Sequence, residues 1–224
     1  MSGALPMLLA WGTVVGLDLV SVPQMMLSRP LVAGALTGLC LGDVASGLRL
    51  GVLFELFQYD ILPVGATRYP EYGPATVVAV AAAHFDGVPF GVGLATVVGL
   101  FTAMLGGVSL QMLRRLNTRA VAQAAPALEA GDVRALTRLH LAGWGRDVVR
   151  AAAVTAAGLG LVALALTFVA PVLTHRGERL LSVAATGAAL AAGAAGTLRI
   201  VGRGVALRWL AAGLAGGVVV AWLS

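Results

Sequence analysis

The 224-residue chain is poor in the residues that a soluble protein places at its surface. Only 11% of its side chains are charged, whereas soluble domains carry roughly a quarter. The single cysteine, Cys40, excludes a disulfide framework, and lysine is absent, so that all fifteen basic residues are arginine. Hydrophobic side chains make up 59% and the mean hydropathy is +0.93, which excludes intrinsic disorder. We therefore expect an all-α integral membrane protein that crosses the bilayer several times.

The sequence also lacks the motifs of several function classes. No Gly-rich phosphate loop is present, which excludes ATP-driven transport by this chain alone. His84, His140 and His175 lie on distant segments and Cys40 has no neighbour at ligand spacing, so neither a metal nor a cofactor is predicted. The net charge of +5 forms no basic patch with interleaved aromatics, so nucleic acid is not an expected partner. No basic segment precedes the first apolar run, and we expect no cleaved signal peptide.

Charge is distributed unevenly along the chain. Residues 1–113 hold three arginines against six acids, a net charge of −3, whereas residues 114–150 and residues 151–224 each carry +4. Ionisable groups within membrane-embedded sequence are costly and usually face a cavity, a partner or a substrate path. The acids of the first half therefore predict that the functional site lies there.

The apolar runs predict two kinds of helix. Gly87–Leu113 and Ala151–Leu173 reach the roughly 20 residues needed to span a bilayer without a charge, and Leu180–Leu198 and Val205–Leu223 are weaker candidates. By contrast, Pro30–Leu62 is apolar but is interrupted by acids and an arginine, which is typical of the broken or re-entrant helices that form transporter binding sites.

We expect one membrane-embedded domain over residues 1–224. In this interpretation residues 1–113 supply the substrate-site helices, residues 114–147 form an arginine-rich cytoplasmic arm with a turn at Gly131-Asp132, and residues 148–224 form C-terminal spanning helices. Small residues recur every four positions at Gly34, Gly38 and Gly42, and again at Gly47 and Gly51. Such ladders predict closely packed helices, within the subunit or against a partner.

The segment from residue 28 to residue 76 carries an ordered series of short motifs. They are Ser28-Arg29-Pro30-Leu31, then Gly42-Asp43, then Gly51 with Glu55 four positions later, then Gly65-Ala66 and Pro70-Glu71. In this order they resemble the membrane subunit IIC of the mannose/fructose/sorbose family of bacterial sugar phosphotransferase systems (PTS). The stretch from Gly131-Asp132 to His140 is also similar to that family, and the resemblance covers most of residues 4–173.

The resemblance implies a sugar-translocating subunit of the bacterial inner membrane that is not itself an enzyme. Such a subunit pairs with a second membrane subunit, IID, while soluble IIA and IIB subunits pass a phosphoryl group to the arriving hexose or amino-hexose. The lipid bilayer and the sugar are then the other partners. Homo-oligomerisation is left open.

Charged and amide groups suit the several hydroxyls of a sugar, and they define our candidate substrate-binding residues. Each has a structural alternative that the sequence leaves open. Glu55 could instead pair with Arg49 or Arg68, Asp43 is favoured as a helix cap, and Arg68 could pair locally with Glu71. Tyr69 and Tyr72 could stack on a sugar or anchor at the membrane interface. The full set of candidates is Gln24, Asp43, Glu55, Gln58, Asp60, Thr67, Arg68, Tyr69 and Glu71.

Two other functions remain in competition. Pro23-Gln24-Met25-Met26 and Pro63 depart from the family pattern, which motivates a PTS-like regulatory or structural membrane subunit that does not transport. Gly42-Asp43 and Tyr59-Asp60 could suggest an intramembrane aspartyl protease. The protease motif fails in detail, because Cys40 stands where its first glycine belongs and the two pairs occur in the wrong order.

Overall fold

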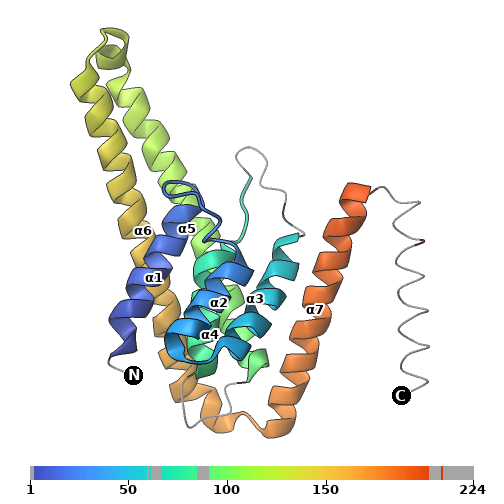
Figure 1. The fold of residues 1–224 in the computed structure, drawn as a ribbon. Coiled ribbons are helices and arrows are strands. Elements are labelled where there is room, and N and C mark those ends of the chain that lie inside the picture. The colour runs from blue at the N-terminus through green and yellow to red at the C-terminus, as the bar shows by residue number, and fades with distance from the viewer. Residues whose placement is uncertain (1–2, 60, 62–66, 85–90, 202–207, 209–224) are drawn as a thin grey trace.

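A computed structural model describes residues 3–59, 61, 67–84, 91–201 and 208, with side chains omitted for residues 198–201. All regular structure in these residues is helical, as predicted (Figure 1). The elements in chain order are α1 (Ala4–Asp18), α2 (Pro30–Leu41), α3 (Val44–Tyr59), α4 (Tyr72–His84), α5 (Val92–Glu129), α6 (Val133–Phe168), the 3₁₀ turn η1 (Ala170–Val172) and α7 (His175–Val201).

Three of the described helices are long and apolar enough to cross a membrane. They occupy Val92–Glu129, Val133–Val172 and His175–Thr197, and they cover residues 92–113, 151–172 and 180–197 of the predicted spans Gly87–Leu113, Ala151–Leu173 and Leu180–Leu198. The predicted span Val205–Leu223 lies outside the described residues except for Arg208.

The arginine-rich segment 114–147 is not a separate element. It continues the helices α5 and α6, whose far ends project beyond the other helices as a hairpin (Figure 1). The predicted turn is present: Gly131 has φ 74°, and the Asp132 carboxylate accepts the backbone N–H groups of Arg134 at 2.8 Å and Ala135 at 3.2 Å. The tip of this hairpin and the start of α7 lie at opposite ends of the molecule (Figure 1). Which end is cytoplasmic stays a prediction.

The helices of the first half are too short to cross a bilayer alone. The helices α1 to α4 contain 12 to 16 residues, or about 18–24 Å at 1.5 Å per residue, against a hydrocarbon core of about 30 Å. The helices α2 and α3 fold into a hairpin beside the long helices, which confirms the prediction of broken or re-entrant segments. The short helix α4 lies at the centre of the core and is buried from Gly73 to Ala82.

The hairpin of α2 and α3 is closed by the glycine ladder. Gly42 ends α2 with φ 77°, and the Asp43 carboxylate caps α3 by accepting the N–H of that helix's third residue at 3.0 Å. A Cβ added to Gly34 would lie 2.5 Å from the carbonyl oxygen of Gly47, and one added to Gly38 would lie 2.5 Å from that of Asp43. The two backbones are therefore in direct contact, and the ladder serves packing within this chain.

The helix α7 packs against α3 and α5, and one acid joins it to α5. Glu178, in the first turn of α7, accepts the N–H groups of Gly93 at 2.9 Å and Leu94 at 3.4 Å. Its carboxylate is 8% exposed and also accepts the hydroxyl of Ser182. Glu178 therefore satisfies the unpaired donors at the N-terminus of a helix 84 residues earlier in the chain, a role that its sequence position did not predict.

Candidate functional site

A cavity of about 260 Å³ lies where the short helices meet. Its walls are the N-terminus of α2, the C-terminal end of α3, the segment before α4 and the start of α4. This is slightly below the roughly 300–1,000 Å³ of pockets that hold drug-sized ligands, so it suits a smaller molecule. The lining residues are Leu19, Ser28, Arg29, Glu55, Gln58, Tyr59, Ile61, Tyr69, Pro70, Glu71, Tyr72 and Gly73.

One wall of the cavity is an ion pair between the two helices of the hairpin. The Arg29 guanidinium, at the N-cap position of α2, donates to the Glu55 carboxylate of α3, whose second oxygen accepts the Leu31 N–H at 3.2 Å. The Glu55 side chain is 11% exposed and that of Arg29 is 45% exposed. The expected partners Arg49 and Arg68 are therefore wrong. Glu55 fixes the start of α2, and Arg29 presents its remaining donors to the cavity.

The last turn of α3 supplies neutral polar groups beside this pair. Gln58 is half-buried and Tyr59 is 50% exposed. The side-chain amide of Gln58 makes no hydrogen bond to any residue that the structure describes, and it can both donate and accept. The ring of Tyr72 packs against Phe54 and Phe57, with ring centroids 6.0 and 6.3 Å apart. Tyr72 thus belongs to an aromatic cluster.

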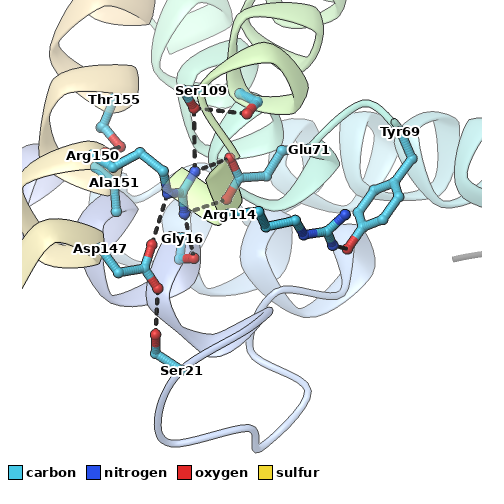
Figure 2. A network of polar contacts seen from close by, with 11 residues as sticks. Gly16, Ser21, Tyr69, Glu71, Ser109, Arg114, Asp147, Arg150, Ala151 and Thr155 are labelled. Carbon is cyan, nitrogen blue, oxygen red and sulfur yellow. Dashed lines mark hydrogen bonds and ion pairs between the residues drawn. The ribbon is translucent and has the colours of Figure 1, made fainter. Parts of the chain in front are cut away.

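Tyr69 forms the opposite wall and is held from outside the cavity. Figure 2 shows Arg114 of α5 reaching the Tyr69 hydroxyl, to which it donates at 2.9 Å. The Arg114 guanidinium also lies 5.2 Å from the centre of the Tyr69 ring and donates to the carbonyl of Thr67 at 3.2 Å. One arginine therefore fixes both the ring and the backbone of this wall.

Two glycines of α5 seat the segment that carries Tyr69. A Cβ on Gly106 would lie 2.7 Å from the Cβ of Glu71, and Gly107 contacts the Tyr69 carbonyl so closely that no Cβ would fit. The Glu71 N–H donates to the carbonyl of Ala103 at 2.9 Å. The segment from Tyr69 to Glu71 thus packs directly against the backbone of α5, and this contact fixes the position of the cavity wall.

Behind this wall lies a buried network centred on Arg150 of α6 (Figure 2). Its guanidinium binds both oxygens of Glu71, at 2.6 and 3.1 Å, and one oxygen of Asp147 at 2.7 Å. It also donates to the carbonyl of Gly16 at 3.0 Å, while Asp147 accepts the hydroxyl of Ser21. The three charged side chains are at most 8% exposed. The expected local pair of Glu71 with Arg68 is therefore wrong, and the network ties α1, α6 and the segment before α4 together.

The remaining candidate residues lie apart from the cavity lining. Asp43 is twelve positions before Glu55, about 18 Å along α3, where it caps that helix. Gln24 is exposed, with φ 57°, in the loop that precedes α2. Thr67 and Arg68 are exposed at the outer edge of the segment before α4, and Asp60 lies outside the described residues.

The loop that carries Gln24 is shaped by a buried acid that we had not named as a candidate. Asp18 is 3% exposed and accepts the N–H groups of Met25 at 2.6 Å and Ser28 at 2.9 Å. It thereby fixes the loop so that Ser28 and Arg29 reach the cavity. Among the described residues, no group of three or more His, Cys, Asp or Glu side chains is arranged to hold a metal ion.

The structure brings four of the sequence candidates together, since Glu55, Gln58, Tyr69 and Glu71 all line the cavity; that they bind a substrate stays a prediction. Sequence reasoning missed Arg29 as a site residue, although the Arg-Pro pair at a helix start was a signal. It also missed Arg150, for which the only signal was a charged pair with Asp147, three positions apart, at the edge of an apolar run.

The chain matches known proteins over nearly its whole length. The family model described as the PTS system sorbose-specific IIC component matches residues 4–221. The fructose permease IIC component of Bacillus subtilis (strain 168) is 29% identical over 113 residues, 50% of this chain and 41% of that protein. The PTS system sorbose-specific EIIC component of Klebsiella pneumoniae is 28% identical over 124 residues, 55% of this chain and 46% of that protein. These matches thus cover less than half of each relative.

Two solved structures share the fold. A chain titled "Structure of membrane protein" superposes with a TM-score of 0.73, and one from the complex of the mannose transporter ManYZ with microcin E492 superposes with a TM-score of 0.59. Each is 17% identical, and each match covers 97% of this chain and 87% of the solved chain. The helical membrane fold is therefore shared with solved proteins, and by its family match the chain belongs to the sorbose-specific IIC component family of the phosphotransferase system.

Proposed function

We propose that this chain is the sugar-translocating IIC subunit of a mannose-type phosphotransferase system in the bacterial inner membrane. It acts with a IID subunit, while IIA and IIB supply the phosphoryl group. The observation that carries the proposal is the cavity at the open end of the α2–α3 hairpin, in a chain of the IIC family. Small cavities between broken helices are the usual position of transporter binding sites.

The cavity offers the groups that a monosaccharide needs. Arg29 supplies charged donors, Gln58 supplies an amide donor and acceptor, and Tyr59 and Tyr69 supply ring faces and hydroxyls. The Glu55 carboxylate orients Arg29 and retains some exposure for a sugar hydroxyl. Glu71 has a different role, because Arg150 already binds both of its carboxylate oxygens. We therefore assign Glu71 to the scaffold of the site.

The position of the cavity along α5 favours an opening to the cytoplasm. Tyr69 is bound by Arg114, the first charged residue after the apolar part of α5. The apolar part, residues 92–113, is about 33 Å long and matches the hydrocarbon core. Arginine-rich boundaries of this kind lie on the cytoplasmic side. In this arrangement the cavity opens toward the IIA and IIB subunits that would phosphorylate the sugar.

The test is sugar binding by this chain co-purified with the IID subunit of its own genome. Radiolabelled sorbose, fructose, mannose and glucosamine would be titrated against the wild type, Gln58→Ala and Gln123→Ala. Gln123 is a matched control, because it is exposed on the projecting part of α5. Loss of one or two sugar hydrogen bonds should weaken binding roughly 5- to 20-fold in Gln58→Ala, with no change in Gln123→Ala.

The same preparation separates the competing functions. Reconstitution with IIA, IIB and phosphoenolpyruvate should give uptake of whichever sugar binds. Sugar binding without uptake would favour the non-transporting regulatory subunit. Absence of saturable binding for all four sugars, or equal affinity in wild type and Gln58→Ala, would contradict the proposed site.

A further inference from the structure

A groove of about 470 Å³ lies on α5, immediately beyond the sugar cavity. It is lined by Gln111, Arg114, Arg115, Thr118 and Arg119, which fall within three turns of one helix. None of these described lining residues carries a carboxylate. The groove begins where the apolar part of α5 ends, so it lies at the boundary between the membrane and water.

The arginines of this groove have N–H donors that no described residue uses. Arg115 and Arg119 are exposed, and neither guanidinium has an ion pair or hydrogen bond with any residue in the part of the chain that the structure describes. Arg114 is half-buried and uses two donor contacts to fix the wall of the sugar cavity, at Tyr69 and at the Thr67 carbonyl. A guanidinium has five N–H donors, so Arg114 retains others.

We propose that this groove binds a phosphate ester, with Arg114, Arg115 and Arg119 as its ligands. Planar guanidinium groups match phosphate oxygens with paired hydrogen bonds, and the combined charge of three arginines with no acid among the lining residues favours a group of two negative charges. The groove and the sugar cavity are joined by one contact, because Arg114 lines the groove and donates to the hydroxyl of Tyr69, which lines the cavity. A phosphate bound in the groove is therefore linked to a sugar in the cavity through the Arg114–Tyr69 pair.

Two molecules of this chemistry reach the site. One is the phosphorylated sugar released on the cytoplasmic side, and this source rests on the proposed function. The other is the headgroup of an anionic phospholipid, which arginines at a membrane boundary attract. The general alternative is that these arginines only set the orientation of the helix, and that reading requires no specific binding.

A matched pair of double variants separates specific binding from net charge. Arg115→Gln with Arg119→Gln removes two charges from the groove, whereas Arg134→Gln with Arg138→Gln removes two exposed charges from the neighbouring helix α6. Both double variants have the same net charge, and in each the substituted side chains are exposed, so folding should be preserved. An unchanged elution profile in size-exclusion chromatography would verify this.

The first arm of the experiment uses the full chain in nanodiscs of phosphatidylcholine, which carries no net charge. Fructose 1-phosphate, glucose 6-phosphate and inorganic phosphate are titrated, and the bound amount is measured by equilibrium dialysis. The groove variant should weaken binding of a hexose phosphate by about tenfold or more, and the α6 variant by less than about twofold. The second arm measures by mass spectrometry how much phosphatidylglycerol is retained during purification.

Each outcome decides the question. Saturable hexose-phosphate binding that only the groove variant loses assigns the groove to the sugar product. Phosphatidylglycerol retention that only the groove variant loses, without hexose-phosphate binding, assigns it to a lipid headgroup. Equal losses in both double variants, or no binding in either arm, overturn the proposal. If free sugars fail to bind the cavity while the groove still binds a phosphate ester, the proposed function fails and the groove assignment stands.

Discussion

Replacing Arg150 by methionine should destabilise the protein more than any single substitution in the cavity wall. Arg150 is the single positive charge in a buried group with Glu71 and Asp147, which are each 1% exposed. Methionine preserves much of the side-chain volume but removes every donor. Two carboxylates would then be left close together without a positive counter-charge, and the Gly16 carbonyl would lose its donor as well.

The magnitude follows from the cost of uncompensated buried charge. Breaking a buried ion pair by removing one partner costs about 3–5 kcal/mol, against a total stability of about 5–15 kcal/mol for a typical protein. For chains of this length each kcal/mol lowers the thermal midpoint by about 2–4 °C, so we expect a loss of roughly 6–20 °C. The midpoint is measured in detergent as the loss of the monodisperse peak in size-exclusion chromatography after heating.

The order of the variants tests the reasoning more sharply than one midpoint. Glu71→Gln leaves the pair of Asp147 and Arg150 neutral and intact, so it should cost less, about 1–3 kcal/mol. The double variant of Glu71→Gln and Arg150→Met should be more stable than the sum of the single losses predicts, because it buries only one unpaired carboxylate. An Arg150→Met protein as stable as wild type, or one more stable than Glu71→Gln, would refute the interpretation of Arg150 as the buried counter-ion.

Three further substitutions test the packing and the helix ends, with thermal midpoints and hydrogen exchange as measurements. Gly34→Ala should cost about 1–3 kcal/mol because its Cβ would meet the backbone of α3. The control Gly160→Ala, with nothing within 4 Å of its Cβ, should be neutral or stabilising by up to about 1 kcal/mol. Equal effects of the two substitutions would contradict the close packing of α2 against α3. Glu178→Ala should cost about 1–2 kcal/mol because the N–H groups at the buried N-terminus of α5 would lose their acceptor, while Glu129→Ala, at the exposed end of the same helix, should change little. Asp132→Ala should speed hydrogen exchange in the first turn of α6 about fivefold, because loss of the N-cap destabilises this turn by about 1 kcal/mol. Unchanged exchange there would contradict the capping role of Asp132.

The sequence predicted the architecture because hydropathy and charge interruptions act locally. Uninterrupted apolar runs became α5, α6 and α7, and the run cut by charges became the α2–α3 hairpin. The predicted arm between residues 114 and 147 was less accurate. Nothing in that segment breaks a helix before Gly131, since even Pro126 lies within α5. The helices therefore continue well beyond the membrane-spanning part.

The partner of Glu55 could have been predicted from the glycine ladder. In an antiparallel hairpin that turns at Gly42-Asp43, a residue before the turn faces one about equally far after it. Arg29 is 13 positions before Gly42 and Glu55 is 12 positions after Asp43, so they meet. Arg49 is six positions before Glu55 on the same helix, where side chains do not face each other. The alternatives that we considered, Arg49 and Arg68, lie nearer to Glu55 in the sequence, and the topology selects the more distant Arg29.

The Glu71–Arg150 pair could not have been predicted in this way. The two residues are 79 positions apart, and the contact depends on how α6 packs beside the segment before α4. Several arginines were equally plausible as partners for an acid in the first half. Only the three-dimensional arrangement shows which one is buried beside it.

Three acids of the first half, Asp18, Asp43 and Glu55, have a common physical role that their position in the sequence did not reveal. Broken helices create additional N-termini in a medium without water, and each leaves N–H groups that require acceptors. Glu55 supplies one at the start of α2, Asp43 supplies one at the start of α3, and Asp18 binds two N–H groups of the loop before α2. The charges of Asp18 and Glu55 therefore build the frame of the cavity, whereas Asp43 acts at the other end of α3. The groups left for a ligand include the donors of Arg29, the neutral amide of Gln58 and the rings and hydroxyls of Tyr59 and Tyr69, and such a site favours an uncharged, hydroxyl-rich molecule over an ion.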